Sequence, residues 1–358
     1  MSATNGSAFS LRSRSSLIGC CMALVLIASA LFASVASANT KTPPLKPTAY
    51  VAIGDSISFG YTEEKFDLNY PAESPSAFEH GFTNVVAAKL AKAEKAAGNG
   101  LNLVNLGCPG ETSDGVIGHA LGNTEEEYDP CAYHNLDGFP LHVEFGGASE
   151  LEAAIGAVSN PVVPVKAVTI NIGSNDELAS VHECENPTYL AENGYTGGLD
   201  ECLVNEVGPG SHRYPGYGVF GHIITNVGTV IGVLRAYGYT GPIAILGFYN
   251  PQAELLPGSD ALQKGFNETF EGYVAASAFG PGVTFANPFP LVNPQNKNEA
   301  SHICKYTEEC NAFDKKVGLE ELVGHPVTAT EAEGYPVGDI HPTPLGYEKI
   351  GKLVYAAL

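Results

Sequence analysis

Five short apolar runs alternate along this chain with longer segments whose apolar residues recur at helical spacing. The runs are Tyr50–Ile53, Leu101–Leu106, Ala167–Ile172, Ile243–Gly247 and Val283–Ala286. The helical segments are Phe82–Ala97, Ser149–Val158, Val219–Tyr237 and Ser259–Ala278, and a last helix follows Pro342-Thr343-Pro344. Strands that alternate with helices in this way form parallel sheets covered on both faces through right-handed crossovers. The pattern predicts a three-layer α/β/α sandwich with a five-stranded parallel sheet.

The first 38 residues have the pattern of a secretory signal peptide. Arg12 and Arg14 supply a positive start, residues 17–35 are apolar and small, and Ala36-Ser37-Ala38 matches a small-x-small cleavage site. Residues 39–48 then form a polar linker rich in Thr and Pro. An uncleaved membrane anchor is the alternative, because the apolar stretch is nearly long enough to span a bilayer. We expect cleavage after residue 38, secretion into the extracellular medium and a single domain over residues 49–358.

The chain is strongly acidic, with a formal net charge of −21. Arg12 and Arg14 leave with the signal peptide, so the mature chain is more negative still. Such a surface repels nucleic acid and anionic lipid, and no basic patch reverses this. We expect no nucleic-acid partner, no stable membrane insertion after signal cleavage, and a monomer.

Six cysteines remain after removal of the signal peptide, and an even number in an exported chain favours disulfides. They fall into three local pairs within polar segments, namely Cys108–Cys131, Cys184–Cys202 and Cys304–Cys310. Zinc binding is the competing interpretation, but no two of these cysteines have the short spacing that zinc sites favour. We therefore predict these three disulfides and no metal.

Three polar, loop-like insertions interrupt the alternation of strands and helices, at Asn123–Gly147, Glu177–Tyr217 and Pro294–Pro336. Long irregular segments of this kind are commonly functional. The second and third adjoin the motifs described next, which predicts that they wall or cover a pocket; surface decoration is the alternative. Aromatic residues in or beside the second insertion indicate either a hydrophobic acyl site or part of the core, and they are Tyr195, Tyr214, Tyr217 and Phe220.

Four short motifs lie at the ends of the predicted elements. Gly54-Asp55-Ser56 follows the first strand, Gly107-Cys-Pro-Gly110-Glu111-Thr112 follows the second, Gly173-Ser-Asn175-Asp176 follows the third, and Asp339-Ile-His341-Pro precedes the last helix. Each motif taken alone is an ordinary turn or helix-capping sequence. However, open α/β folds bind ligands at the carboxyl ends of their strands, so motifs in these positions converge on one site.

In this order the four motifs resemble those of the GDSL or SGNH hydrolase family of secreted bacterial esterases and lipases. The resemblance extends from about residue 50 to residue 358. It implies a flavodoxin-like sandwich, in agreement with the fold expected from the pattern. It also implies that Ser56 is the nucleophile, that His341 is the general base, and that Gly110 and Asn175 help to form an oxyanion hole.

The chemistry of these residue types supports the same roles. A serine hydroxyl is a poor nucleophile and needs a base, for which His341 is suited because its intrinsic pKa is near working pH. The oxyanion that forms during ester attack needs donors, which the backbone amides of Ser56 and Gly110 and the side chain of Asn175 can supply. Asp55 and Asp176 are expected to cap helices or to brace loops.

One position departs from the family pattern. The family usually has an aspartate three residues before the histidine, but Gly338 occupies that position here and Asp339 lies only two residues before His341. Either Asp339 still reaches the imidazole through a local change of register, or a backbone carbonyl such as that of Gly338 accepts the imidazole N–H. We favour the carbonyl slightly, because a shift of one residue redirects a side chain.

The sequence therefore predicts a secreted serine ester hydrolase that acts through an acyl-enzyme on a small-molecule or lipid ester, without a cofactor. One alternative is a carbohydrate acetylesterase of the same fold. The absence of tryptophan argues slightly against it, although tyrosines can also form sugar-binding platforms. The other alternative, of a different class, is a secreted binding protein without catalytic activity. That alternative predicts a damaged site, whereas Ser56, Gly110, Asn175 and His341 are all present.

Overall fold

The structure is a computed structural model that describes residues 44–69, 72, 74–118, 131–253, 258–295, 300–312, 315–316, 328 and 338–358. The predicted signal peptide, residues 1–38, lies outside the described residues, as does the first half of the predicted linker, residues 39–43. Residues Leu45–Leu358 form one compact unit.

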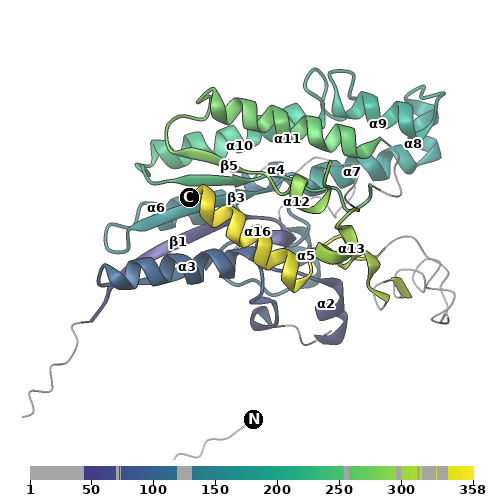
Figure 1. Cartoon of the computed structure of the whole chain (residues 1–358). Coiled ribbons are helices and arrows are strands. Elements are labelled where there is room, and N and C mark those ends of the chain that lie inside the picture. Colours follow the sequence, from purple (N-terminus) through teal and green to yellow (C-terminus); the bar gives the residue numbers. More distant parts are fainter. Residues whose placement is uncertain are drawn as a thin grey trace, which may run out of the picture. The chain divides into compact units, whose positions relative to one another are not determined.

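The core of this unit is a five-stranded sheet in which every neighbouring pair of strands is parallel (Figure 1). The strands are β1 (Lys46–Gly54), β2 (Asn99–Asn105), β3 (Val165–Asn171), β4 (Ile243–Leu246) and β5 (Val283–Ala286). Their order in the sheet is β2-β1-β3-β4-β5, the flavodoxin-like order. The predicted fold class and all five predicted strands are confirmed.

The first strand begins earlier than the sequence pattern indicates. β1 starts at Lys46, so the last three residues of the predicted linker belong to the sheet. At this end β1 pairs with β2 alone, because its pairing with β3 begins only at Ala49. Pro47 lacks an N–H, and a strand with one neighbour tolerates it.

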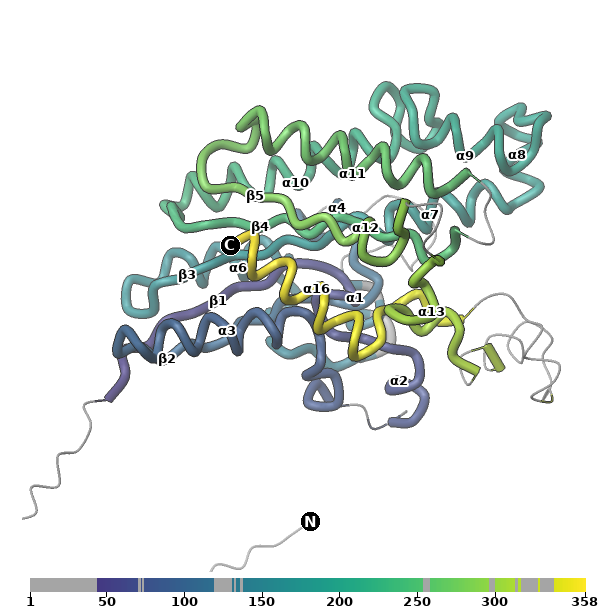
Figure 2. The backbone as a smooth tube through the Cα atoms, viewed as in Figure 1, coloured from purple at the N-terminus to yellow at the C-terminus, as the bar shows by residue number. Residues whose placement is uncertain are grey.

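Helices cover both faces of the sheet because successive side chains of a strand point to opposite sides. Tyr50 and Ala52 of β1 pack in one apolar cluster with side chains of α3 (Phe82–Ala96) and α16 (Pro344–Ala357). Val51 and Ile53 pack in the other cluster, with side chains of α6, α10 and α11. These three helices span Glu150–Val158, Gly218–Ala236 and Ser259–Ala275. The tube in Figure 2 shows α16 beside α3, and α11 beside α10.

Helix α10 is long and apolar enough, by length and composition, to cross a membrane. Its buried residues, among them Ile223, Val227 and Leu234, lie in the apolar cluster against the sheet. That burial is the pattern of a core helix, as the sequence predicts for this segment.

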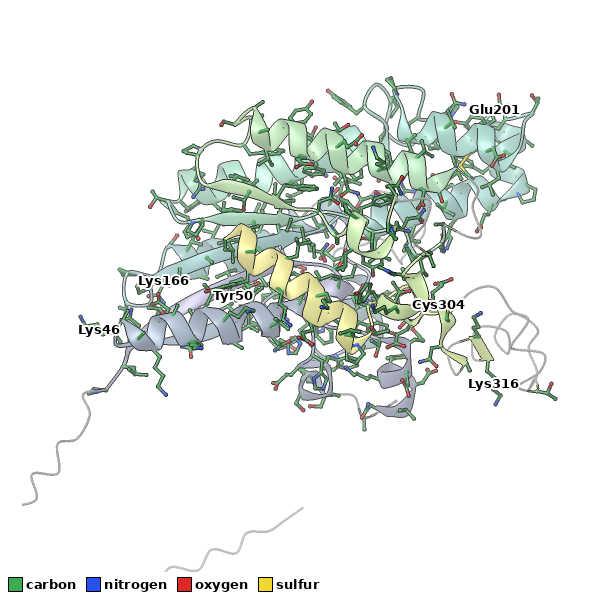
Figure 3. The ribbon with its side chains drawn as sticks, in the orientation of Figure 1. Lys46, Tyr50, Lys166, Glu201, Cys304 and Lys316 are labelled. Carbon is green, nitrogen blue, oxygen red and sulfur yellow. A yellow bond between two sulfur atoms is a disulfide. The ribbon has the colours of Figure 1, made fainter. Side chains whose placement is uncertain are left out.

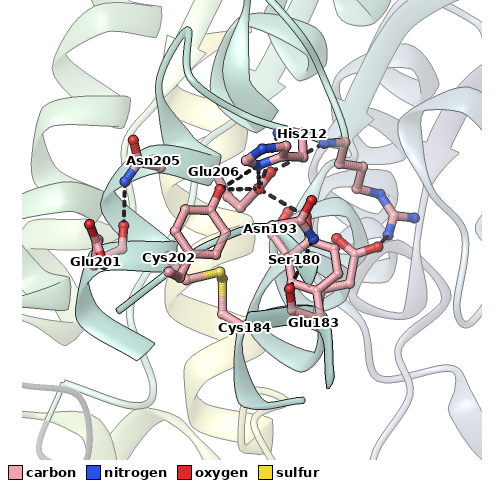
Figure 4. Close-up of a disulfide and its surroundings, with 12 residues drawn as sticks. Ser180, Glu183, Cys184, Asn193, Glu201, Cys202, Asn205, Glu206 and His212 are labelled. Atoms are coloured by element: carbon pink, nitrogen blue, oxygen red, sulfur yellow. Dashed lines mark hydrogen bonds and ion pairs between the residues drawn. A yellow bond between two sulfur atoms is a disulfide. The ribbon is translucent and has the colours of Figure 1, made fainter. Parts of the chain in front are cut away.

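The second predicted insertion is helical, which corrects the expectation of a loop-like segment. It contains most of α7 (Ser174–Glu185), together with α8 (Pro187–Glu192) and α9 (Leu199–Val207). The residues that suggest a loop stand at helix ends: Asn186 caps α8 by accepting the amide of Thr188, and Pro187 occupies the first turn. The Cys184–Cys202 disulfide joins α7 to α9 (Figure 4).

The remaining short helices lie in the connections. They are α1 (Ser56–Phe59), α2 (Glu63–Asn69), η1 (Pro75–Phe78), α4 (Ser113–Val116), α5 (Ala132–Asp137), α12 (Phe289–Val292), α13 (Ile303–Tyr306) and η3 (Glu308–Cys310). In Figure 3, Lys46 and Lys166 mark the amino ends of β1 and β3, and Cys304 of α13 lies toward the opposite end. The segments after β1, β2 and β3 therefore gather at one edge of the sheet.

Candidate active site

The first motif forms the turn between β1 and α1. Gly54 has a φ of 152°, and a Cβ there would lie 2.0 Å from the backbone oxygen of Asn171 in β3, so the turn requires glycine. Asp55 is the N-cap of α1, where its Oδ1 accepts the amide of Ile57 at 2.9 Å. The strand therefore ends abruptly, and Ser56 takes the first helical position at the edge of the sheet.

The fourth motif brings a histidine to this serine from the far end of the chain. Nε2 of His341 lies 2.7 Å from Oγ of Ser56, although the two residues are 285 positions apart. Nδ1 of the same ring forms a hydrogen bond with Oδ1 of Asp339. A hydroxyl, an imidazole and a carboxylate thus stand in series, which is the arrangement that activates a serine.

The preference for a backbone carbonyl as the partner of His341 is wrong. Oδ1 of Asp339 also accepts the amide of His341 at 3.0 Å, forming a turn in which an aspartate binds the backbone two residues further on. This turn places the carboxylate of Asp339 beside the imidazole, so an aspartate only two residues before the histidine can still bind its ring. Gly338 has no room for a side chain, since a Cβ there would lie 2.3 Å from the backbone oxygen of Glu309.

Charges set the protonation of the Asp339–His341 pair. Burial by itself would raise the pKa of Asp339 and lower that of His341. Burial is the largest single effect on each group, but the opposite charge of the partner and the hydrogen bonds together outweigh it, so the pKa of Asp339 lies below its ordinary value and the pKa of His341 lies above it. The backbone amide of Glu63 donates to Oδ2 of Asp339 at 2.8 Å and lowers the pKa of Asp339 further. The negative charges of Glu63 and Asp55 raise the pKa of His341 further.

Gly110 and Asn175, from the second and third motifs, line the same cleft as Ser56. Nδ2 of Asn175 donates to the backbone oxygen of Glu111 at 2.7 Å, which ties the third motif to the second. An amide group carries two hydrogens, so this group can also donate into the cleft. Gly110 has a φ of 79°, and a Cβ there would lie 2.4 Å from the ring of Tyr133, so this position also requires glycine.

The cleft that these residues line has a volume of about 310 Å³. Four aromatic side chains contribute to its wall, and they are Tyr61, Phe66, Tyr133 and Phe139. The ring centroid of Tyr61 lies 4.8 Å from that of His341. No sequence signal identifies these residues, because they come from α2, α5 and the segments beside them, where no periodic pattern marks a side that faces a site.

The three predicted insertions contribute differently to this site. The first supplies Tyr133 and Phe139 to the cleft, although only the second and third were expected there, and the second supplies Leu178 and His182 from α7. None of the described residues of the third insertion lines the cleft. That segment instead braces the loop of His341, because the amide of Glu308 in η3 donates to the carbonyl oxygen of His341 at 2.9 Å.

The aromatic residues considered from the sequence as an acyl site lie elsewhere. Tyr214 and Phe220 pack in the apolar cluster against the sheet, which is the alternative of a core position. Tyr217 is 66% exposed, and the hydroxyl of Tyr195 donates to Glu206 at 2.9 Å. None of the four lines the cleft. Their nearness in sequence to the third motif therefore does not bring them to the cleft.

Buried carboxyl groups hold the turns of the site together. Asp176 accepts the amide of Ser113 at 2.8 Å and its hydroxyl at 2.6 Å, which joins the third motif to α4. Oε2 of Glu150 accepts the amide of Gly54 at 2.8 Å, directly beneath the first motif. The expectation that Asp55 and Asp176 cap a helix and brace a loop is therefore confirmed.

Burial raises the pKa of each of these carboxyl groups, because a medium of low polarity disfavours their charge. The pKa of Asp55 rises to about 7, that of Glu111 to about 8 and that of Asp176 to about 6, and that of Glu150 lies well above its ordinary value. The negative charge beneath the cleft is thereby reduced. This suits a site in which an oxyanion has to form.

The Cys108–Cys131 disulfide joins the second motif to α5. Oε2 of Glu111 accepts the amide of Cys131 at 3.0 Å and adds a second link between the same segments. Tyr133 follows two residues later, and its ring lies against Gly110. The position of the Gly110 amide therefore depends on α5 and on the disulfide that anchors it.

The other two disulfides join neighbouring helices, Cys184 with Cys202 and Cys304 with Cys310. All three predicted pairings are confirmed. A sulfur atom in a disulfide is not the thiolate that zinc binds, so these cysteines do not form the zinc site weighed as the competing interpretation.

Comparison with known protein families identifies the family of this chain. The model of the GDSL-like lipase/acylhydrolase family matches residues 52–349, from β1 to α16. The chain belongs to this family. Membership makes it a hydrolase of the esterase or lipase type. No curated protein matches the chain significantly.

This GDSL-like hydrolase is also similar to solved structures at low identity. A lipase from a goat rumen metagenome, Lip_vut3, is 14% identical with a TM-score of 0.43, over 87% of this chain and 97% of the other. An extracellular lipase from Streptomyces rimosus is 15% identical with a TM-score of 0.40, over 87% and 100%. A carbohydrate esterase family 2 enzyme from Corynascus thermopiles, solved with a carbohydrate binding domain, is 16% identical with a TM-score of 0.41, over 88% and 66%.

Proposed function

We propose that this protein is a secreted serine ester hydrolase that acts through an acyl-enzyme intermediate. The observation that carries the proposal is the series of hydrogen bonds from Ser56 through His341 to Asp339 at the edge of the cleft. Membership of the GDSL-like family supports ester hydrolysis, and the series supplies a way to perform it.

In the first half-reaction, Oγ of Ser56 attacks the carbonyl carbon of the ester while Nε2 of His341 takes the hydroxyl proton. The tetrahedral intermediate then breaks its bond to the alcohol oxygen, which leaves with that proton. In the second half-reaction, water gives a proton to Nε2 and its oxygen attacks the acyl carbon. The bond to Oγ of Ser56 breaks, the hydroxyl regains the proton, and the carboxylic acid is released.

Hydrogen-bond donors lower the barrier because negative charge develops on the carbonyl oxygen in both tetrahedral intermediates. We assign the backbone amides of Ser56 and Gly110 and the side-chain amide of Asn175 to this role. The hydrogen bond from Asn175 to Glu111 holds the amide in orientation before substrate arrives. Donors that are already oriented need no reorganisation in the transition state.

Asp339 is assigned the role of orienting His341 and of stabilising the imidazolium that forms when Ser56 loses its proton. Its lowered pKa supports this role, because the carboxylate stays ionised wherever the enzyme works at neutral pH. We therefore propose a triad rather than the dyad considered from the sequence.

A fluorophosphonate probe tests the proposal directly, because it labels only an activated serine. We expect stoichiometric labelling of the native protein and none of the Ser56→Ala variant. Ser159→Ala is the matched control, since Ser159 is an exposed serine at the end of α6 that does not line the cleft, and its loss should leave labelling intact. A native protein that is not labelled would favour the alternative of a binding protein without catalytic activity.

The volume and the aromatic wall of the cleft favour acyl groups longer than acetyl, which argues for an esterase or lipase over an acetylesterase of carbohydrates. Burial contributes about 0.8 kcal/mol per methylene, or up to about fourfold in rate. We expect kcat/KM on p-nitrophenyl esters to rise from acetate through butyrate to octanoate. A sharp optimum at acetate would support the acetylesterase instead.

We also propose export with removal of residues 1–38. The three disulfides support it, because they persist in oxidising compartments. Mass spectrometry of the protein from culture medium should find Asn39 as its first residue; recovery of the intact chain in membranes would support the anchor instead.

Sedimentation of the mature protein should give the mass of a monomer.

A further inference from the structure

Glu150 is a fully buried carboxyl group that none of the proposed catalytic steps uses. It is the first residue of α6, and its exposed fraction is 0%. The start of α6 does not need this side chain, because Ser149 and Glu152 form a capping box that satisfies two backbone amides there. The side chain of Glu150 instead leaves its own helix, and its Oε2 accepts the amide of Gly54 at 2.8 Å. The carboxyl group therefore serves the turn that carries the proposed nucleophile.

This hydrogen bond lies where the chain after β1 and the chain after β2 separate. β2 ends at Asn105, and beyond it the amide of Cys108 donates to the carbonyl oxygen of Gly54 at 2.8 Å. The amide of Gly54 binds Glu150 in place of a neighbouring strand. The amide of Cys108 also favours the charged form of Glu150, so both amides act on one carboxyl group. A buried amide without a partner is costly, and Glu150 removes that cost from the turn.

One side chain thus joins the two turns that carry the proposed backbone donors of the oxyanion hole. Gly54 lies two residues before Ser56, and Cys108 lies two residues before Gly110. Glu150 does not line the cleft itself, and α6 is packed against the sheet, so the carboxyl group supports both turns from below. Donors stabilise an oxyanion most when their positions are fixed before the reaction. The place of Glu150 therefore suits a residue that fixes them.

The surroundings of Glu150 favour an uncharged carboxyl group. The negative charges of Glu111 and Asp55 face it, and its Oε1 has no hydrogen-bond partner among the described residues. On two helices that contact α6, Asp114 of α4 and His222 of α10 bind each other at 2.9 Å. Burial and the charge of Glu111 raise the pKa of Glu150 well above its ordinary value. An uncharged acid at this position adds no negative charge to oppose the oxyanion above it.

We propose that Glu150 is a positioning residue of the reaction, and that it works as an uncharged carboxylic acid which holds the turns of Ser56 and Gly110 in place relative to each other. It acts through the backbone of Gly54 and Cys108 and does not contact the substrate. The inference rests on the proposed function, because it needs Ser56 and Gly110 to donate to an oxyanion. A residue that acts as an uncharged acceptor is replaceable by glutamine, which has the same shape, but not by leucine, which has no acceptor.

Hydrolysis of a p-nitrophenyl ester by two variants tests the proposal. Glu150→Leu should lower kcat by about 10–10² with little change in KM, because a misplacement of about 1 Å at the reacting groups has an effect of that size. Glu150→Gln should keep kcat close to the native value. Glu152→Leu is the matched control, because Glu152 is an exposed residue of the same helix whose loss removes the capping box but should leave kcat unchanged.

Two outcomes would overturn the proposal. If Glu150→Gln loses as much kcat as Glu150→Leu, the carboxyl group acts through a negative charge, which the amino end of α6 would favour. If Glu150→Leu keeps the native kcat, or changes KM instead, Glu150 does not position the oxyanion donors.

Infrared spectroscopy measures the charge of Glu150 directly and without a substrate. The difference spectrum between the native protein and Glu150→Gln at neutral pH should contain the carbonyl stretch of a carboxylic acid. Bands of a carboxylate in its place would overturn the proposal. Because glutamine keeps an acceptor for the amide of Gly54, this measurement decides the charge even if Glu150→Leu does not fold.

Failure of the inference and failure of the proposed function have different signatures. Native protein that hydrolyses no p-nitrophenyl ester beyond the level of Ser56→Ala would refute the proposed function, and the inference with it. Native protein that hydrolyses the ester, while Glu150→Leu does so with the same kcat, would refute the inference alone.

Discussion

Ser56, Gly110 and Asn175 each lie just beyond the carboxyl end of a strand, whereas His341 lies in a loop before α16. The register of three adjacent parallel strands brings the first three residues to one edge of the sheet. The loop of His341 has no strand to place it, and it depends on hydrogen bonds from Tyr249 to Ile340 and from η3 to His341.

The site therefore has a strand-end side, formed by Ser56, Gly110 and Asn175, and a loop side, formed by His341. The sheet and the glycines at its turns position the strand-end side, so small changes in surrounding loops should leave it in place. The loop side is set by contacts between distant segments. Variants on each side of the site can test this distinction.

The largest losses of activity should come from changes to Ser56 and His341, the two residues that form a hydrogen bond between the strand-end side and the loop side. Ser56→Ala and His341→Ala should each lower kcat by about 10⁶, because neither the nucleophile nor the base works without the other. Steady-state hydrolysis of a p-nitrophenyl ester measures both. If His341→Ala loses much less than Ser56→Ala, another group supplies the base and the loop side is not essential.

Asp339→Asn should lower kcat by about 10⁴, because it leaves the imidazole in the wrong tautomer and removes the charge that stabilises the imidazolium. Near-normal activity would refute the triad. In the double variant Gly338→Asp/Asp339→Asn, the aspartate is moved to the position usual in the family. It should not restore activity, because a side chain at 338 collides with the backbone of Glu309.

Asn175→Ala should lower kcat by about 10²–10³ with a smaller change in KM, because the lost donor acts mainly on the oxyanion. The matched control is Asn205→Ala, since Asn205 is a partly exposed residue of α9 that does not line the cleft and whose side-chain amide donates to the backbone oxygen of Glu201 in the same helix. An equal loss in both variants would indicate a general loss of stability rather than a loss of oxyanion stabilisation.

Removal of the Cys108–Cys131 disulfide should lower kcat by about 10–10² at temperatures where the protein stays folded, because α5 and Tyr133 then position Gly110 less accurately. The double variant Cys184→Ala/Cys202→Ala is the control. It loses a comparable cross-link in the second insertion, with a similar expected cost of about 2–4 kcal/mol in the free energy of unfolding. Equal kcat in the two double variants would show that the second motif does not need its disulfide.

The smallest effect concerns pH. His341 has to be unprotonated to act as base, so kcat/KM should fall as the pH drops below its pKa, which Asp339, Glu63 and Asp55 raise above the ordinary value. Glu63→Gln removes one of these charges but keeps the backbone amide that binds Asp339, so the acid limb should move to lower pH by a fraction of a unit. Glu64→Gln, the neighbour that does not line the cleft, should leave the limb in place.

The sheet and the strand-end motifs are predictable because each depends on a local signal. A buried apolar run followed by Gly54-Asp55-Ser56 is both a strand end and a helix cap, and the structure shows both. The disulfides are predictable for a similar reason, since each pair is close in sequence. The second insertion is predicted wrongly because Asn186 and Pro187, which favour turns, also start helices.

The orientation of His341 was not predictable from the position of Asp339 alone. A spacing of two residues is compatible with a carboxylate that points away, and the turn that Asp339 makes with the amide of His341 decides the matter. The amide of Glu63, which lies 276 positions away in sequence, completes that turn by binding the other carboxylate oxygen. No local pattern encodes such a partner.

Local sequence signals specify the α/β/α sandwich, the three cysteine pairs and the residues that meet at the edge of the sheet, because periodicity and turn chemistry act over a few residues. The pairing of Asp339 with His341, in contrast, requires the three-dimensional contacts of the folded chain. The same holds for the aromatic residues of the cleft, which come from α2, α5 and the segments beside them. These features depend on contacts between segments far apart in the chain, which the packing of the whole unit brings together.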